Sequence, residues 1–340
     1  MEQLLQPQSS LDSFQIIQGG TGNYAVSNPK PDKNIIQIGN SIKELNKIHE
    51  HDSNIEIGSA VKLAKLEEFF QTIIKKSEEN APVFNLGKVF IKALSSLASA
   101  QIRNIASIGG SVMWRHPSSD LMVLYILLGC QLRVRGPDGV VKDIVIDESF
   151  HVSKSEDLLS NGSIILSLMI PKPSSEHFIG FYKKSKRKEF ALSIVNLGII
   201  LKQDAKRAGN FTNVKIVIGG TENPGKIEPH CYHKIGHNVM KEIMDVKGVS
   251  MPNLIEAINK DLPINVEYKK LGVYRQGLAV SFIKHFLNAL VKQKTEEVME
   301  EKFERTSTQA YQKVKNDQPN YDDVERPIPH NCSAEQGYFH

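Results

Sequence analysis

The sequence predicts an α+β fold in two parts, and three observations lead to that prediction. In residues 11–170, short strand patterns are interspersed with amphipathic helix patterns. Beyond that region, three strand patterns follow one another with short connections, which is typical of an antiparallel meander. The proline-rich stretch 171–176, Pro-Lys-Pro-Ser-Ser-Glu, lies between the two parts and marks the expected domain boundary.

The first part contains three stretches that are predicted to be helices. In residues 63–76 and 83–97, apolar side chains recur at helical spacing, as on one face of an amphipathic helix. The continuous apolar run 121–129 is interpreted as a buried helix. The strands of this part are predicted at residues 14–17, 34–38, 55–60, 131–134, 140–145 and 164–170.

The second part is predicted to be a smaller three-stranded antiparallel sheet packed with helices. From residue 294 onward the chain is charged and polar, as in a linker. We therefore expect domains at 1–174 and 175–293, followed by a linker region at 294–340. The strands of the second part are predicted at 178–182, 193–202 and 214–218, and its helices at 236–260 and 274–293.

Charge and composition are those of an ordinary soluble chain of about two domains. The net charge is only +4 over 340 residues, and the basic residues are spread along the chain apart from one cluster, Lys-Lys-Ser-Lys-Arg-Lys at 183–188. This loop is either a solvated connection between strands or a contact for nucleic acid or phosphate. No set of aromatic side chains flanks it as a stacking platform, so we expect no nucleic-acid partner.

The three cysteines, Cys130, Cys231 and Cys332, are too far apart in the sequence to form a local iron–sulfur or zinc site. No disulfide pairing is implied, which is typical of a reducing compartment. The N-terminus lacks the features of a signal peptide, and the apolar runs are too short to span a bilayer. We therefore expect a cytoplasmic protein without a membrane contact.

Two glycine-rich segments are the candidates for ligand binding. In the first, a predicted strand runs directly into Gly19, Gly20 and Thr21, whose backbone amides and hydroxyl could hold a phosphate. The second, residues 106–111, places small residues between apolar ones, and Asp120 adds an acceptor further on. The alternative interpretation is that both segments are only turns at strand ends.

The sequence contains no recognisable catalytic set of its own. It has no G-x-S-x-G nucleophile motif and no G-x-x-x-x-G-K-[ST] phosphate loop. The histidines are scattered, and His230 and His233 lack the further ligands that a metal site needs. An enzyme of this kind would leave the chemistry to a bound cofactor. We therefore predict no catalytic residue and no metal ligand.

The glycine-rich segments resemble those of a known family. Residues 101–111, Gln-Ile-Arg-Asn-Ile-Ala-Ser-Ile-Gly-Gly-Ser, and the later Ser-Asp-Leu at 119–121 resemble the second FAD-binding segment of the aldehyde oxidase and xanthine dehydrogenase family. Residues 17–21, Ile-Gln-Gly-Gly-Thr, resemble the first segment, and 164–168 resemble the strand that covers the adenine. The resemblance covers residues 12–292 and implies a two-part FAD-binding domain of the vanillyl-alcohol-oxidase type.

The resemblance implies FAD as the cofactor and assigns the residues that bind it. Both glycine-rich segments would contact the diphosphate, with Asp120 near the ribityl chain or the diphosphate, and three further residues near the adenine. The cofactor-binding residues implied in this way are Gly19, Gly20, Thr21, Gly22, Leu97, Ala98, Ala106, Ser107, Gly109, Gly110, Ser111, Asp120 and Ile165.

The sequence also departs from the family pattern. Gly20 and Ser111 stand where asparagine is usual, and Trp114 is bulkier than the usual residue. Ile194 stands where xanthine dehydrogenases have a lysine near the flavin, which is similar to the aldehyde oxidase branch. That branch passes electrons to oxygen, so the acceptor is either oxygen or NAD.

Iron–sulfur and molybdenum-cofactor domains flank this region in the family's single-chain enzymes. The widely spaced cysteines do not supply the first, and residues 324–330, Val-Glu-Arg-Pro-Ile-Pro-His, resemble the opening of the second. We expect an FAD-binding oxidoreductase module that passes electrons from iron–sulfur centres to oxygen or NAD, and a fragment or truncated member of an aldehyde or xanthine hydroxylase. The alternative is a non-catalytic paralogue or a stand-alone FAD subunit that binds partner subunits. Its expected partners are the missing domains in trans, with a homodimer left open.

Overall fold

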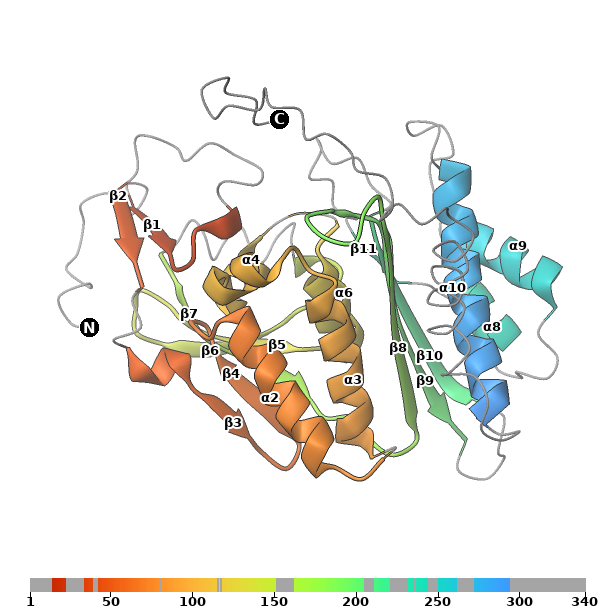
Figure 1. The fold of residues 1–340 in the computed structure, drawn as a ribbon, viewed down its shortest axis with the longest axis horizontal. Helices are drawn as coiled ribbons and strands as arrows, with labels where there is room; N and C mark the ends of the chain where they lie inside the picture. The colour runs from red at the N-terminus through yellow and green to blue at the C-terminus, as the bar shows by residue number, and fades with distance from the viewer. Residues whose placement is uncertain are drawn as a thin grey trace, which may run out of the picture. The chain divides into compact units, whose positions relative to one another are not determined.

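The computed structural model has the expected mixture of helices and antiparallel sheets (Figure 1). The chain divides into two compact units, Met1–Leu287 and Asn288–His340. The family-like residues 324–330, together with Cys231 and Cys332, lie outside the described residues. The structure describes residues 14–22, 34–38, 42–79, 81–114, 116, 118–150, 162–204, 211–220, 232–234, 237–243, 250–261 and 272–293.

A five-stranded antiparallel sheet in the order β3-β4-β7-β5-β6 forms the centre of the first part. In β4, Ile55 and Ile57 are fully buried while Glu56 between them is partly exposed, the alternation of a sheet with one covered face. Strand β7 lies between β4 and β5, so Leu168 faces Ile57 across the ladder. The strands are β3 (Ile48–Glu50), β4 (Asn54–Gly58), β5 (Gln131–Arg135), β6 (Val141–Val145) and β7 (Ile164–Pro171).

Helices α2 (Leu63–Lys76), α3 (Pro82–Ser95) and α6 (Asp120–Leu128) lie together in front of this sheet (Figure 1). The predicted bounds of α2 are confirmed. The apolar stripe of this helix packs on α3. The rings of Phe70 and Phe90 stack between these two helices with centroids 4.6 Å apart. Helix α6 is apolar on every side and buried along almost its whole length, as its sequence predicts.

Two short helices join α3 to α6, namely α4 (Ala100–Ile105) and α5 (Ile108–Met113). The second glycine-rich segment is therefore not a turn between strands, because Gly109 and Gly110 lie inside α5. Glycine disfavours helix, so local preference does not explain this conformation. Backbone bonds to distant residues hold it instead: the amides of Ile108 and Gly109 donate to the carbonyls of Val61 and Ser59, at 3.0 Å and 2.8 Å.

The second part is a four-stranded antiparallel sheet in the order β11-β10-β9-β8. Its three predicted strands are confirmed as β8 (His177–Ser185), β9 (Ser193–Gln203) and β10 (Phe211–Gly219). The fourth, β11 (Tyr232–Lys234), was not predicted, because three residues are too few to show a periodicity.

This sheet lies between two sets of helices (Figure 1). Helices α3 and α6 contact it on one side. On the other side, Tyr182 stacks on Phe282 with ring centroids 5.4 Å apart. Here a Cβ on Gly180 would lie 2.6 Å from Cδ2 of Phe286, so a side chain at 180 would displace that ring. The helices on this side include α8 (His237–Ile243), α9 (Met251–Asp261) and α10 (Gly272–Gln293).

The remaining described elements lie near the N-terminus. Strands β1 (Phe14–Ile17) and β2 (Asn34–Gln37) pair in parallel as a separate two-stranded sheet. A 3₁₀ turn, η3 (Lys43–Asn46), precedes β3.

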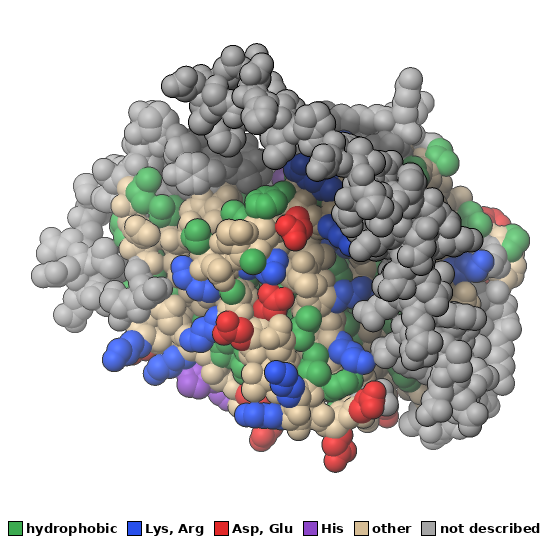
Figure 2. Space-filling model, viewed as in Figure 1, with side chains coloured by type: hydrophobic (Ala, Val, Ile, Leu, Met, Phe, Trp, Pro, Cys, Tyr) green, Lys and Arg blue, Asp and Glu red, His purple; other side chains and the backbone are tan. Residues whose placement is uncertain are grey.

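Basic and acidic side chains are interspersed over the described part of the face that carries α2 and α3 (Figure 2). Among the described helices, none combines the length and the apolar character needed to cross a membrane.

Candidate functional site

The two glycine-rich segments meet in the structure. A Cβ on Gly19 would lie 2.2 Å from the carbonyl oxygen of Ile105 and 3.2 Å from Cα of Ala106. These distances are shorter than van der Waals contact to backbone atoms, so only glycine fits at position 19. We call residues 18–22 together with 105–114 the loop junction. Segments separated by more than eighty residues in sequence thus form one surface.

A side-chain hydrogen bond and a left-handed glycine fix the conformation of the first segment, residues 18–22. Its Gln18 side chain donates from Nε2 to the carbonyl of Ala60 at 2.7 Å. Gly20 has a φ of +67°, the left-handed conformation that glycine adopts without strain. Thr21 and Gly22 form a helical turn directly after it. The segment is therefore a tight, backbone-rich turn that follows strand β1, as predicted.

The second segment uses its own amides internally. Ser107 is the N-cap of α5 and accepts from the amide of Gly110 at 3.2 Å. The amide of Ser111 donates to the carbonyl of Ser107 at 2.9 Å, and the Ser111 hydroxyl donates to the carbonyl of Ile108 at 2.7 Å. Ala106 is buried, whereas Gly110 is exposed. The amides of this segment are therefore already hydrogen-bonded within the protein, and its exposed surface at Gly110 carries no side chain.

Ser111 is also tied to the core. Its hydroxyl lies 3.1 Å from the hydroxyl of Tyr125 in helix α6. Burial raises the pKa of Tyr125 well above its usual value, so this phenol keeps its proton at all physiological pH values. The serine that replaces the family's usual asparagine thus has two partners inside the protein.

Lys62 is a residue of this site that the sequence did not single out. Its Nζ donates to the carbonyl oxygen of Ile105 at 3.2 Å, the same oxygen that Gly19 approaches. An ammonium group therefore lies where the two segments meet. The only signal in the sequence was the position of Lys62 between a strand and a helix, which does not separate it from other surface lysines.

Trp114 and Gln18 are two more residues at the loop junction, and each carries a buried polar side-chain atom without a partner in the described residues. A Cβ on Gly22 would lie 3.2 Å from Cδ1 of Trp114, so the indole packs against the first segment. The buried Nε1 of Trp114 and the buried Oε1 of Gln18 have no hydrogen-bond partner in the part of the chain that the structure describes. One free donor and one free acceptor thus remain beside the glycine surface.

Leu97, Ala98 and Ile165 lie around the second segment. Leu97 and Ala98 directly precede α4, and the Leu97 carbonyl accepts from Arg103 in that helix at 3.0 Å. Ala98 has a φ of +49°, and its carbonyl accepts from the amide of Phe190 at 3.2 Å. Ile165 is partly buried in strand β7 and packs against the core. The structure thus places Leu97 and Ala98 together before α4, and Ile165 on strand β7.

Asp120 lies in a buried polar group that we call the Asp120 cluster: Asp120, Lys183, Ser193 and Asn196. Lys183 Nζ lies 2.5 Å from Oδ2 of Asp120, and both side chains are at least nine-tenths buried. Ser193 Oγ and Asn196 Nδ2 donate to Oδ1 at 2.5 Å and 2.8 Å. Lys183 also donates to the carbonyl of Ser96 at 2.7 Å. The cluster ties the start of α6 to strands β8 and β9.

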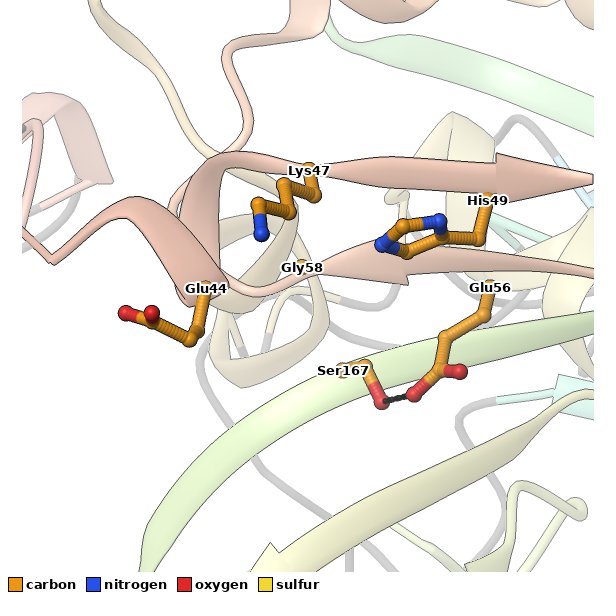
Figure 3. Close-up of a pocket in the computed structure, with 6 residues that line it drawn as sticks. All are labelled: Glu44, Lys47, His49, Glu56, Gly58 and Ser167. Atoms are coloured by element: carbon orange, nitrogen blue, oxygen red, sulfur yellow. Dashed lines mark hydrogen bonds between the residues drawn. The ribbon is translucent and has the colours of Figure 1, made fainter.

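A separate hollow of about 240 Å³ lies beside strands β3, β4 and β7 (Figure 3). There Ser167 donates to Glu56 at 2.6 Å, and this bond, with Arg133, holds the pKa of Glu56 below its usual value. Pockets for drug-sized ligands hold about 300–1,000 Å³, so this one is too small for a dinucleotide. It is lined by Glu44, Lys47, His49, Glu56, Gly58 and Ser167.

Comparison with known proteins assigns the chain to a class of flavoprotein domains. Residues 1–173 match the family model described as "FAD binding domain in molybdopterin dehydrogenase". The chain belongs to this family, and its cofactor is FAD. The resemblance to aldehyde oxidases and xanthine dehydrogenases is thereby confirmed.

Individual relatives support this assignment. The chain is 26% identical over 309 residues to aldehyde oxidase 3 of Rattus norvegicus, covering 85% of this chain and 22% of that protein. It is 32% identical over 180 residues to xanthine dehydrogenase 2 of Arabidopsis thaliana, covering 53% of this chain and 13% of that protein. The chain thus spans less than a quarter of the length of these relatives.

Solved structures share the fold. A chain of a carbon monoxide dehydrogenase from Hydrogenophaga pseudoflava superposes with a TM-score of 0.64 at 17% identity, covering 82% of this chain and 90% of that one. A chain of quinoline 2-oxidoreductase from Pseudomonas putida 86 gives a TM-score of 0.61 at 15% identity, covering 82% of this chain and 89% of that one. These likenesses extend over both parts of the fold.

The loop junction fits FAD on its own geometry. Gly19 and Gly20 leave no side chain over the turn, so a ligand can approach the backbone closely. Lys62 places a positive charge beside the turn, which suits a diphosphate. The free indole N–H of Trp114 and the free amide oxygen of Gln18 match a cofactor that carries both acceptors and donors.

Proposed function

We propose that FAD binds at the loop junction, with its diphosphate against the turn at Gly19, Gly20, Thr21 and Gly22. The observation that carries this proposal is the contact of Gly19 with the Ile105 carbonyl, which joins the two family-like segments into one surface. Lys62 Nζ reaches the same carbonyl and would balance part of the diphosphate charge.

The second segment would support the cofactor mainly through shape. Its amides at Gly109, Gly110 and Ser111 already donate within the protein. Its exposed Gly110 therefore lets the ligand lie close to the helix backbone. The expected contact of Asp120 with FAD stays a prediction, as do those of Ala106 and of Leu97, Ala98 and Ile165 with the adenine end.

The reaction that we propose is electron transfer. Bound FAD supplies redox chemistry that no side chain of this chain offers. The residues of the chain bind and orient it, and the buried Asp120 cluster holds α6, which follows the second segment, against strands β8 and β9. We propose that the electrons come from iron–sulfur centres on other domains or subunits and pass to oxygen or NAD.

A spectroscopic titration tests the proposal. The purified chain is mixed with FAD, freed of unbound cofactor by gel filtration, and its visible spectrum is recorded before and after anaerobic dithionite. We expect stoichiometric flavin absorption that bleaches on reduction and returns with oxygen. Failure to retain FAD at any concentration would overturn the proposal. Retained flavin that is never reduced by added iron–sulfur partner domains would favour a non-catalytic paralogue.

A further inference from the structure

Trp114 lies between the first glycine-rich segment and a buried histidine. It follows the last residue of α5, and its Cδ1 is the atom nearest to the position that a Cβ on Gly22 would take. Its other face stacks on His116, with ring centroids 5.0 Å apart and an interplanar angle of 18°. Burial lowers the pKa of His116, so the imidazole in this stack is neutral at neutral pH. The indole is therefore held in place from two sides.

The polar atom of this side chain has nothing to bind. Nε1 of Trp114 is buried and has no hydrogen-bond partner within the described residues. An indole N–H is a donor only, and a buried donor without an acceptor destabilises a protein by about 1–3 kcal/mol. Natural structures avoid such atoms unless a ligand or water supplies the acceptor. Gly22 belongs to the turn proposed above to hold FAD, so the bound cofactor is a candidate for that acceptor.

We propose that the indole N–H of Trp114 donates a hydrogen bond to bound FAD. This inference rests on the proposed FAD site, since Gly22 belongs to the turn that would hold the diphosphate. FAD carries hydrogen-bond acceptors in the oxygens of its central diphosphate and in the carbonyl oxygens and nitrogens of the flavin ring at one end. The chemistry needed is the same in either case, a desolvated acceptor facing the indole edge. Trp114 thereby becomes a further cofactor-binding residue.

The substitution Trp114→Phe isolates the hydrogen bond. Phenylalanine keeps an aromatic ring that can stack on His116, and it removes the N–H. We expect the dissociation constant for FAD to rise about fivefold to tenfold, the effect of one lost hydrogen bond. We expect the midpoint of thermal unfolding without FAD to stay the same or rise, because the orphaned donor is gone. A purely structural tryptophan would give the opposite pair of results: a lower midpoint and an unchanged FAD affinity.

Trp114 also reports on binding directly, because it is the one tryptophan among the 340 residues. We expect its emission to fall in proportion to the FAD that co-elutes on gel filtration, and the Trp114→Phe variant to lack that emission. Titrations with ADP and with riboflavin locate the acceptor. Weaker ADP binding by the variant would place it on the diphosphate, and weaker riboflavin binding would place it on the ring.

The two proposals fail in different ways. If the unchanged protein retains no FAD, the proposed function itself is wrong. If it retains FAD, while the affinity of Trp114→Phe equals that of the unchanged protein, only the role of Trp114 is overturned.

Discussion

The two glycine-rich segments of the loop junction and Asp120 were predicted as parts of one cofactor site, and the structure shows two different kinds of polar environment around them. In the Asp120 cluster, a carboxylate that is at least nine-tenths buried receives hydrogen bonds from Lys183, Ser193 and Asn196. At the loop junction, the side chains of Gln18 and Trp114 each keep a buried atom without a partner in the described residues.

The difference separates folding from binding. A charge removed from water is tolerated only when its partners are supplied, so the three donors around the Asp120 carboxylate indicate a structural tie between elements, although Oδ1 of Asn196 has no partner in the described residues. Unsatisfied atoms beside a side-chain-free surface indicate a place for a ligand. Substitutions in the cluster should therefore change stability, and those at the junction should change FAD affinity.

The largest expected effect is in the cluster. Lys183→Met leaves the buried Asp120 carboxylate without its counter-ion, and we expect the free energy of unfolding to fall by about 3–5 kcal/mol. Urea denaturation followed by circular dichroism measures it. Lys184→Met, at the exposed neighbouring position, is the control and should change stability by less than about 0.5 kcal/mol. If the two variants were equally stable, the Asp120 cluster would not stabilise the fold.

The next effect tests whether the contact between Gly19 and the Ile105 carbonyl also stabilises the fold. Gly19→Ala forces a Cβ against the Ile105 carbonyl, so we expect a loss of about 1–3 kcal/mol of stability and no FAD binding. Gly277→Ala is the control: no atom lies within 4 Å of its added Cβ, and alanine favours helix α10 by about 0.5–1 kcal/mol. An alanine at 19 that leaves both stability and FAD binding intact would contradict the observed contact.

Gly110→Ala should separate binding from folding at the junction itself. Its added Cβ meets only Ser107 Oγ, at 3.1 Å, and helix α5 favours alanine, so the free energy of unfolding should change by less than about 1 kcal/mol. A methyl group on the exposed surface should nevertheless weaken FAD binding about tenfold, or about 1.4 kcal/mol. Equilibrium dialysis with FAD, beside thermal unfolding without it, distinguishes the two. Unchanged affinity would place FAD away from this helix.

The smallest effect concerns charge. Lys62→Gln removes the ammonium beside the turn, and we expect FAD affinity to fall by at most about fivefold, since the group is partly solvated. The loss should shrink as salt is raised from about 0.01 M to 0.15 M, because screening weakens the interaction. Lys65→Gln is the matched control, because Lys65 is exposed and donates instead to the carbonyl of Asn46. If the FAD affinity of both variants had the same salt dependence, Lys62 would not interact with the diphosphate.

Local pattern in the sequence was enough for the main elements and for the family. The apolar spacing of 63–76 predicted α2 with its observed bounds, and the three long strands of the second sheet were predicted from their strand-like runs of residues. Those patterns work because each side chain's face is fixed by its own helix or strand. The glycine-rich segments predicted FAD through their resemblance to the family's FAD-binding segments, whereas their residue types alone left a simple turn open.

What the tertiary structure alone decided is which residues meet. Lys183 reaches Asp120 across 63 residues of sequence, and Lys62 reaches Ile105 across 43. Gly109 and Gly110 lie in a helix because Ser59 and other distant residues bond to its backbone, against glycine's own preference. Such contacts depend on how helices and sheets pack and not on local spacing. For that reason the sequence by itself determined that the chain binds FAD, and packing determined which polar side chains are left free for it.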